Sequence, residues 1–257
     1  MRPELTSVSP GVVRVSWPVE LELAKAEELA RSVRAATREA FGNGTTRVEA
    51  YVDPDDRPGQ RVATLAGLRK EGIARGAADG RDRIVYALLA DDEPADHPVG
   101  FRAMLNSLLP RKRAIGQLLL RDPDDRVLLC QLTYKSDFDL PGGVVEVGES
   151  PRLAVAREVE EELGLVLDAG QLLLADWLPP WSGWDDALCL VFDGGVHDPA
   201  VVESFVRQER EIRSAGFYTL DETREHCADF TARRIEAALA SIGSPGAGYT
   251  ESGRQVF

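Results

Sequence analysis

The sequence predicts an α/β protein with two parts, and three observations support this prediction. Strand-like and helix-like segments alternate along the chain. With 257 residues, of which 44% are hydrophobic, the chain can form two modest cores. From Asp91 the composition changes to "DDEPADHP", which is acidic, contains two prolines and has no periodicity, so we expect a domain boundary there.

The segment before this boundary predicts two helices among strands. A helical period runs from about Leu21 to Phe41 and stops at "GNG", and a second helix is expected in "RPGQRVATLAGLR". The strand candidates are "GVVRVSW", "RVEAYV" and "DRIVYALLA". After the boundary, a helix from about Val99 to Leu109 ends before Pro110.

The second half predicts strands followed by a closing helix. Two apolar runs around a "DPDD" turn in "RAIGQLLLRDPDDRVLLCQLTY" indicate a β-hairpin. Further strands are expected in "QLLLADWL", "DALCLVFDGG" and "EIRSAGFYTL", and a helix from about Phe230 to Ser241. The tail at 243–257 is small and polar, which predicts a mobile segment.

The acidic composition excludes several kinds of partner. The formal charge is −13 and the pI is about 4.8, whereas non-specific binding to nucleic acid or an anionic membrane needs a basic face. The chain starts without a signal pattern and has no apolar run long enough to span a membrane, so a cytoplasmic protein is expected. Cys130, Cys189 and Cys227 lie far apart without CxxC spacing and predict reduced thiols rather than a disulfide or zinc site.

The segment "GVVEVGESPRLAVAREVEEELGL" at 143–165 predicts a charged helix with defined ends. Ser150 followed by Pro151 is a strong helix start. Gly164 is placed to end the helix, which is therefore expected over 151–163. The preceding "LPGG" predicts a tight turn whose backbone approaches the helix, because glycine tolerates conformations that other residues avoid.

Three glutamates share one arc of this helix, beside its apolar face. At roughly 100° per residue, Glu158, Glu161 and Glu162 converge next to a surface that packs on the core. Partial burial makes three ionised carboxylates costly unless a cation neutralises them, and their oxygens suit Mg²⁺ or Mn²⁺ better than zinc. The alternative is a solvated face, which "EVEEE" by itself would favour.

The spacing of the whole segment resembles the Nudix box. Nudix hydrolases cleave a diphosphate linked to a nucleoside or another group, use divalent cations held by the box, and fold as an α/β/α sandwich with a mixed sheet. The resemblance implies that fold for residues 111–242. It implies metal ligands at Glu158, Glu161, Glu162 and the Gly143 carbonyl, and a catalytic set of Glu161, Glu162, Arg157 and Glu149, the last two forming a structural pair across the loop.

The base that activates the attacking water varies in this family. Glu161 and Glu162 are candidates inside the box. Glu211, in "EREIRSAGF", is a possible base outside it, and a solvated surface acid is the alternative for that residue.

Substrate recognition is expected outside the box. Trp177, Trp181 and Trp184 fall in the loop-like "DWLPPWSGWDD", where exposed aromatic rings stack well on a base. A plain core position is the alternative for each tryptophan. Tyr134 and Lys135 could flank the site, with Lys135 contacting phosphate or acting as an ordinary turn residue.

The N-terminal part has a different resemblance. "RVEAYVDPDDRPGQRVATLAGLRKEGIARG" followed by "RDRIVYALL" looks like the second half of a GNAT acetyltransferase. That family binds the pyrophosphate of acetyl-CoA at a glycine-containing turn before a helix. Here "AKAE" at 24–27 occupies that place, and Glu27 and Glu28 would oppose a phosphate. We expect a partial, degenerate GNAT-like domain over 1–92, used for packing or homodimerisation, followed by a linker and helix over 93–110.

The function predicted by these resemblances is a metal-dependent Nudix pyrophosphohydrolase. Its substrate would be a nucleoside-diphosphate-linked molecule of the ADP-ribose or nucleotide-sugar type. Two alternatives stay open: a pyrophosphatase of damaged nucleoside triphosphates, and a non-catalytic module that senses a nucleotide.

Overall fold

The computed structural model describes residues 2–18 and 22–256, so the predicted helix start near Leu21 lies outside the described residues. The chain divides into two compact units, one reaching Pro110 and the other beginning at Arg111. The boundary lies after helix α3 (Pro98–Leu108) rather than near Asp91. This helix belongs to the first unit because Ser107 Oγ accepts the Lys70 N–H at 3.0 Å.

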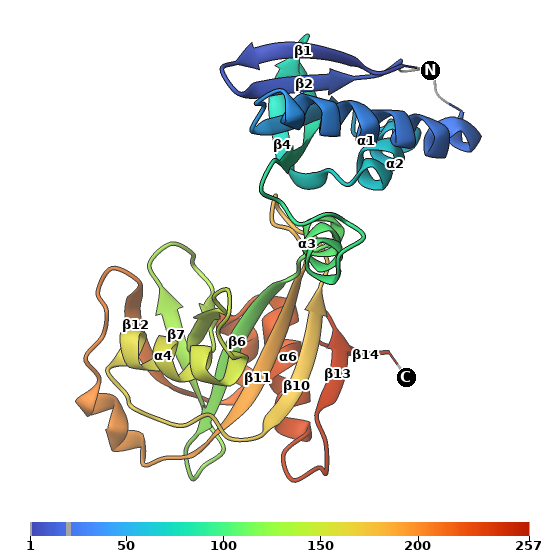
Figure 1. The fold of residues 1–257 in the computed structure, drawn as a ribbon. Coiled ribbons are helices and arrows are strands. Elements are labelled where there is room, and N and C mark those ends of the chain that lie inside the picture. Colours follow the sequence, from blue (N-terminus) through green and yellow to red (C-terminus); the bar gives the residue numbers. More distant parts are fainter. Residues whose placement is uncertain (1, 19–21, 257) are drawn as a thin grey trace. The chain divides into compact units, whose positions relative to one another are not determined.

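The N-terminal unit is a five-stranded sheet with helices packed against it (Figure 1). The strand order is β1-β2-β3-β5-β4, and the neighbours β2 and β3 run parallel. Helices α1 and α2 bury a core with the sheet that includes Leu29, Val33, Val48, Val62 and Tyr86. The elements are β1 (Glu4–Ser9), β2 (Val12–Ser16), α1 (Ala26–Gly42), β3 (Arg47–Val52), α2 (Arg57–Ala66), β4 (Arg69–Ala78) and β5 (Arg81–Leu89).

Two strands of this unit have no counterpart in the sequence prediction. All six residues of β1 are exposed, so the strand carries no alternation of buried and exposed positions. Strand β4 contains Gly72 and Gly76, both with positive φ, and its pairing with β5 is irregular. Glycine weakens the sequence signal of a strand, which explains why β4 was missed.

The C-terminal unit is a nine-stranded mixed sheet with a helix on each face. The main strand order is β12-β7-β6-β11-β10-β13-β14, while β8 pairs with β7 and β9 with β6. Its elements are β6 (Arg113–Arg121), β7 (Val127–Leu132), β8 (Phe138–Asp139), β9 (Gly142–Val144), α4 (Pro151–Leu163), β10 (Leu172–Leu178), β11 (Ala187–Val196), β12 (Ile212–Tyr218), α5 (Leu220–His226), α6 (Asp229–Ala240), β13 (Gly248–Glu251) and β14 (Arg254–Gln255).

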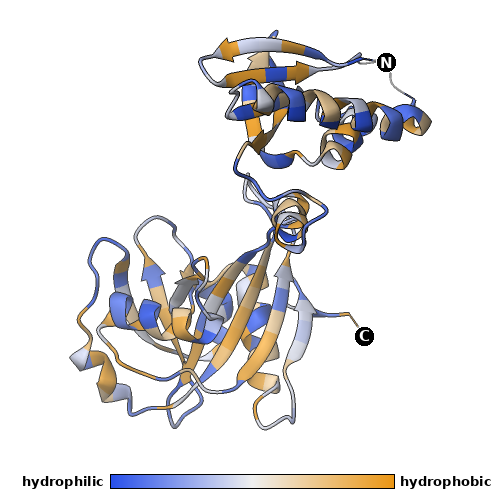
Figure 2. Ribbon diagram, viewed as in Figure 1, coloured by the Kyte–Doolittle hydropathy of each residue, from blue (hydrophilic) through white to orange (hydrophobic). Residues whose placement is uncertain are grey.

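Alternating residues of β6 supply the two cores of this sandwich. Leu118 and Leu120 pack in one core with Val155 of α4, whereas Leu119 packs in the other with Ile235 of α6. A strand that is covered on both faces reads as a continuous apolar run, and Figure 2 shows β6, β10 and β11 as largely hydrophobic. The predicted α/β/α sandwich is therefore confirmed.

The predicted hairpin of β6 and β7 opens beyond its turn. The two strands pair only at Arg121 and Val127, next to the turn. Farther along, β9 pairs with β6 and β8 pairs with β7. The splayed strands therefore place the turn between β8 and β9 in the gap between β7 and β6, where the charged helix α4 packs.

The predicted mobile tail was wrong for much of its length, because β13 and β14 lie in it. Strand β13 runs parallel to β10, and the buried Asp176 of β10 accepts hydrogen bonds from Thr250 Oγ1 and the Gly253 N–H, both at 2.8 Å. Polar tail residues thus satisfy the Oδ1 atom of a buried carboxylate. Composition alone does not reveal this, because the acceptor lies far away in the sequence.

Two further predictions concern the whole chain. Cys130, Cys189 and Cys227 are buried free thiols, as expected. Among the described residues, no helix combines the length and apolar character needed to cross a membrane.

The buried ion pair between Arg234 and Asp176 generates a stability prediction. Arg234 Nε lies 2.8 Å from Asp176 Oδ2, and both side chains are almost fully buried. Replacing Arg234 by Met leaves the carboxylate buried without its countercharge, so we expect the C-terminal unit to lose about 3–5 kcal/mol of unfolding free energy in urea titrations.

A matched control uses the exposed pair between Arg224 and Glu236. The Arg224→Met variant should unfold at nearly the same urea concentration as the parent protein, because exposed ion pairs add little. Equal destabilisation by the two variants would contradict the structural role assigned to the buried pair.

Candidate active site

Helix α4 is held close to the sheet by its sequence. Pro151 occupies the first turn, and Gly164 ends the helix with a φ of 68°. Ser150 is the N-cap residue, although its side chain makes no capping hydrogen bond. A Cβ on Gly116 of β6 would lie 2.4 Å from Val155 Cγ2, so only glycine allows this approach of helix and strand.

Glu162 is the buried carboxylate of the helix. It is 5% exposed and accepts the Gly142 N–H at 2.9 Å. Burial, together with the charges of Glu158, Glu211 and Asp139, raises the pKa of the Glu162 carboxyl to about 8, against the lowering effect of that hydrogen bond. The Glu162 carboxyl is thus shielded from water and lies within the electrostatic reach of other carboxylates.

Glu158 lies against the same turn. A Cβ on Gly143 would come within 2.4 Å of the Glu158 carboxyl carbon, so the turn backbone touches the carboxylate directly. Burial raises the pKa of Glu158, as do the charges of Glu161 and Glu211, while its contact with Arg157 opposes the change. The predicted close approach of the "LPGG" turn to the helix is present.

Arg157 joins the loop to the helix. Its Nε and Nη2 donate to Glu149 Oε1 and Oε2 at 3.0 and 3.1 Å, which is the expected bidentate pair. Its Nη1 also donates to Glu158 at 3.0 Å and to Glu161 at 3.1 Å. The hydrogen bonds from Arg157 to Glu149, together with one from the Glu146 N–H, hold the pKa of the Glu149 carboxyl below its usual value. One guanidinium therefore fixes three carboxylates.

The three helical glutamates differ in their exposure and in their contacts. Within residues 2–18 and 22–256, no three His, Cys, Asp or Glu side chains are grouped so as to hold a metal ion. The Glu161 side chain is 53% exposed and accepts from the same Arg157 Nη1 as Glu158, whereas Glu158 and Glu162 lie against the glycine turn. The donor chemistry of those two still fits a hard divalent cation, because both are desolvated oxygen ligands that repel one another.

Glu211 faces the same acidic cluster. It lies just before β12, is exposed, and its carbonyl accepts the Thr133 N–H at 2.8 Å. Its negative charge helps to raise the pKa of both Glu158 and Glu162. The structure therefore brings this predicted residue near the box.

A pocket of about 630 Å³ opens beside the glycine turn, and both Gly142 and Gly143 line it. Trp181 and Trp184 also line it and are 64% and 61% exposed. Trp181 makes an edge contact with Phe230, and Arg113 stacks on Trp184. The predicted pair Tyr134 and Lys135 contributes to the lining as well.

Trp177 is not among the lining residues. It lies in β10, and its indole N–H donates to Asp186 Oδ2 at 3.1 Å. Lys135 lies in the pocket wall but is paired with Asp139 at 2.8 Å, which offsets part of its charge. The other four predicted substrate-binding residues line the pocket.

The sequence reasoning missed a buried polar chain behind this pocket. Arg234 donates to Gln117 Oε1 at 3.1 Å, and Gln117 donates to Asp139 at 2.8 Å. Arg234 lines the pocket, and its Nη2 has no hydrogen-bond partner among the described residues. A signal existed: Arg234 occupies the same helical arc as the apolar Ile235 and Ala238, where a charge is unexpected.

Comparison with known proteins identifies the family. Residues 110–239, just over half of the chain, match the profile described as "NUDIX domain". A "MutT-like protein" of Streptomyces ambofaciens is 32% identical over 134 residues, covering 51% of this chain and 78% of that protein. A "NAD-capped RNA hydrolase NudC" of Mycobacterium tuberculosis is 36% identical over 109 residues, covering 41% of this chain and 32% of that protein.

A third relative matches over a shorter stretch. An "ADP-ribose pyrophosphatase" of Methanocaldococcus jannaschii is 42% identical over 55 residues, covering 20% of this chain and 32% of that protein. The chain thus spans about a third of the NudC protein and of this archaeal protein, and most of the Streptomyces one. The profile match and the coverage of the Streptomyces relative show that the chain belongs to the NUDIX family of hydrolases.

Proposed function

We propose that the C-terminal unit is a metal-dependent pyrophosphohydrolase that cleaves the diphosphate bond of a nucleoside-diphosphate-linked substrate, of the ADP-ribose or nucleotide-sugar type. The observation that carries this proposal is the pair of desolvated carboxylates, Glu158 and Glu162, on a glycine turn that also lines an aromatic pocket. An aromatic surface beside anionic groups that suit a cation supports this proposal, because a nucleotide diphosphate needs both.

The cation would be Mg²⁺, with Mn²⁺ as the alternative. Glu158 and Glu162 would hold it, with Glu161 and the Gly143 carbonyl as the other proposed ligands. When bound, the ion would offset the charge of the phosphate oxygens and lower the pKa of the attacking water. Without it, the anionic side chains would repel a diphosphate.

The residues around the cation have separate roles in this proposal. Arg157 and Glu149 keep the loop on the helix, so they position Glu158. Glu161, Glu162 and Glu211 are the candidates for the group that takes the proton from water. Glu211 is a candidate because its negative charge acts on Glu162 and helps to raise the pKa of that carboxyl.

The pocket would bind the base of the nucleotide. Trp181 and Trp184 offer exposed ring faces, and Tyr134 and Lys135 line the pocket with them. The free Nη2 of Arg234 would donate to an acceptor on the ligand, since a buried guanidinium without a full set of partners favours one. The archaeal relative's name supports ADP-ribose as the first substrate to test.

The alternatives are less well supported. A nucleoside triphosphate would occupy the same pocket and cation site, and it differs in releasing pyrophosphate. Burying the Glu162 carboxylate costs free energy, and a non-catalytic sensor would gain nothing from that cost. The buried free thiols favour a cytoplasmic location for either activity.

For the N-terminal unit we propose a degenerate GNAT-like fold used for packing or homodimerisation. The parallel pair β2 and β3, joined through α1, supports the likeness. Glu27 and Glu28 lie in the first turn of α1, where they would repel a pyrophosphate. We expect this unit to bind no acetyl-CoA.

The role of Glu162 is tested by replacing it with Gln. The amide keeps an oxygen that can accept the Gly142 N–H, so the fold should persist, while kcat should fall by at least about a hundredfold because the charge is lost. Glu160→Gln is the matched control on the same helix and should retain the parent rate. A Glu162→Gln enzyme with an undiminished rate would refute the assignment.

Metal dependence and substrate class are tested together. We expect chelation by EDTA to stop AMP release from ADP-ribose and added Mg²⁺ to restore it. Mg²⁺ should also raise the melting temperature of the parent protein but not that of Glu162→Gln, because only the former offers the full carboxylate set. Pyrophosphate release from triphosphates with no cleavage of ADP-ribose would favour the alternative substrate class.

The aromatic pocket is tested at Trp181. The Trp181→Ala variant should raise KM about tenfold with little change in kcat, because base stacking contributes about 1–3 kcal/mol of binding. Trp177→Phe preserves packing in β10 and should leave KM unchanged, since Trp177 does not line the pocket. The reverse pattern in steady-state kinetics would place the base elsewhere.

A further inference from the structure

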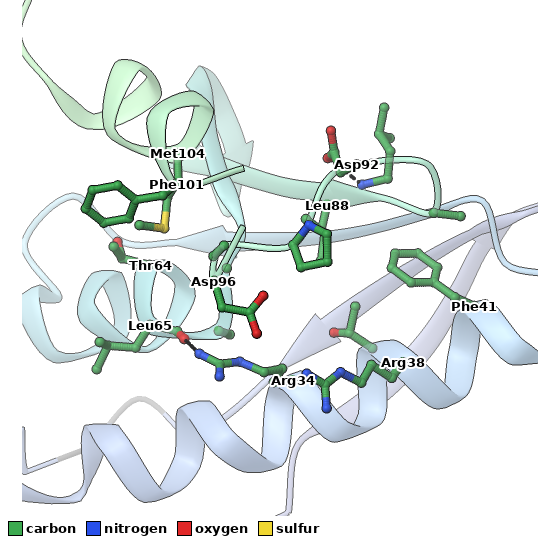
Figure 3. A pocket seen from close by; sticks show the side chains of 17 residues that line it. Arg34, Arg38, Phe41, Thr64, Leu65, Leu88, Asp92, Asp96, Phe101 and Met104 are labelled. Carbon is green, nitrogen blue, oxygen red and sulfur yellow. Dashed lines mark hydrogen bonds between the residues drawn. The ribbon is translucent and has the colours of Figure 1, made fainter. Parts of the chain in front are cut away.

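The N-terminal unit contains a cavity that takes no part in the proposed hydrolysis. Its volume is about 430 Å³, within the range of about 300–1,000 Å³ that is usual for small-molecule sites. The walls come from the second half of α1, the end of α2, the end of β5, and α3 with the loop before it (Figure 3). The cavity is therefore built from elements of the same unit.

Much of the wall is apolar. Phe41, Leu88, Phe101 and Met104 line the cavity, and Figure 3 shows these side chains coming from α1, β5 and α3. Phe101 is 48% exposed, so an aromatic ring remains without cover. Apolar walls around a small volume favour a ligand with an apolar body.

Two arginines stand on one face of α1 at this cavity. The Arg34 side chain donates to a backbone carbonyl of α2. The Arg38 guanidinium has no hydrogen bond or ion pair among the described residues. The lining includes two acids: Asp92 is paired with Arg69 at 2.6 Å, and Asp96 has no such partner. Two guanidiniums therefore face one uncompensated carboxylate, which leaves a single net positive charge.

A buried hydroxyl lies between the two arginines in the sequence. Thr37 is 1% exposed, lines the cavity, and its Oγ1 has no hydrogen-bond partner in the part of the chain described. Thr64, which lines the same cavity, donates to the Gln60 carbonyl at 2.9 Å. Buried polar side chains normally have a hydrogen-bond partner, so the Thr37 hydroxyl adds a polar group to this wall that is not used within the protein.

We propose that this cavity binds a small organic monoanion, an acid with an aromatic or branched apolar body. Its carboxylate would lie at Arg38 and Arg34, and its apolar part against Phe41 and Met104. A single net charge favours a carboxylate over a phosphate dianion. The site is separate from the Nudix site, and its existence does not depend on the proposed hydrolytic function.

Met104 makes the cavity directly observable. The chain has two methionines, Met1 and Met104, so protein labelled with ¹³C at the methionine methyl groups gives one signal from the cavity. Titration of the full chain with 2-naphthoate should move the Met104 methyl signal to a saturating shift. The neutral analogue 2-naphthamide should bind at least about tenfold more weakly, because it lacks the charge-assisted contact.

A pair of variants separates the site from general electrostatics. Arg38→Gln should raise the Kd for 2-naphthoate about tenfold or more, since Arg38 has no structural partner to lose. Arg31→Gln removes the same charge from α1 outside the cavity lining and should leave the Kd near the parent value. A Met104 signal that does not move, equal binding of acid and amide, or equal effects of the two variants would each overturn the proposal.

Discussion

The C-terminal unit depends on the close contact between the Gly142–Gly143 backbone and the carboxylates of α4. Glycine at both positions lets the turn lie where any Cβ would collide with Gly116 or with Glu158. The contact aligns a backbone N–H with Glu162 and closes one wall of the aromatic pocket. Charge repulsion among the acids opposes this arrangement, and Arg157 offsets part of it.

A second constraint lies behind the pocket. One ion pair and two hydrogen bonds join Asp176, Arg234, Gln117 and the partly buried Asp139, and they link the tail to the pocket wall. A buried polar group without a partner costs free energy, whereas a network in which the groups bond to one another offsets that cost. Gln117, Asp139 and Arg234 of this network all line the pocket, and the Arg234 Nη2 atom bonds to no other described group.

The sequence predicted the fold well where local signals were strong. Pro151 and Gly164 set the bounds of α4, and continuous apolar runs revealed the covered strands. It failed where stability comes from distant partners, as with the tail strand at Thr250 bonded to Asp176. It also did not foresee that Arg157 Nη1 donates to both Glu158 and Glu161, because helical geometry fixes the direction of a side chain but not its hydrogen-bond partner.

The tail strands have a consequence for how the pocket could be altered. Ser252, between β13 and β14, lines the pocket together with Trp181. The hairpin of β13 and β14 thus contributes to the pocket wall while lying outside the stretch that matches the family profile. A change of the Ser252 side chain would therefore alter the pocket wall without removing the hydrogen bonds that Thr250 and Gly253 donate to the buried Asp176.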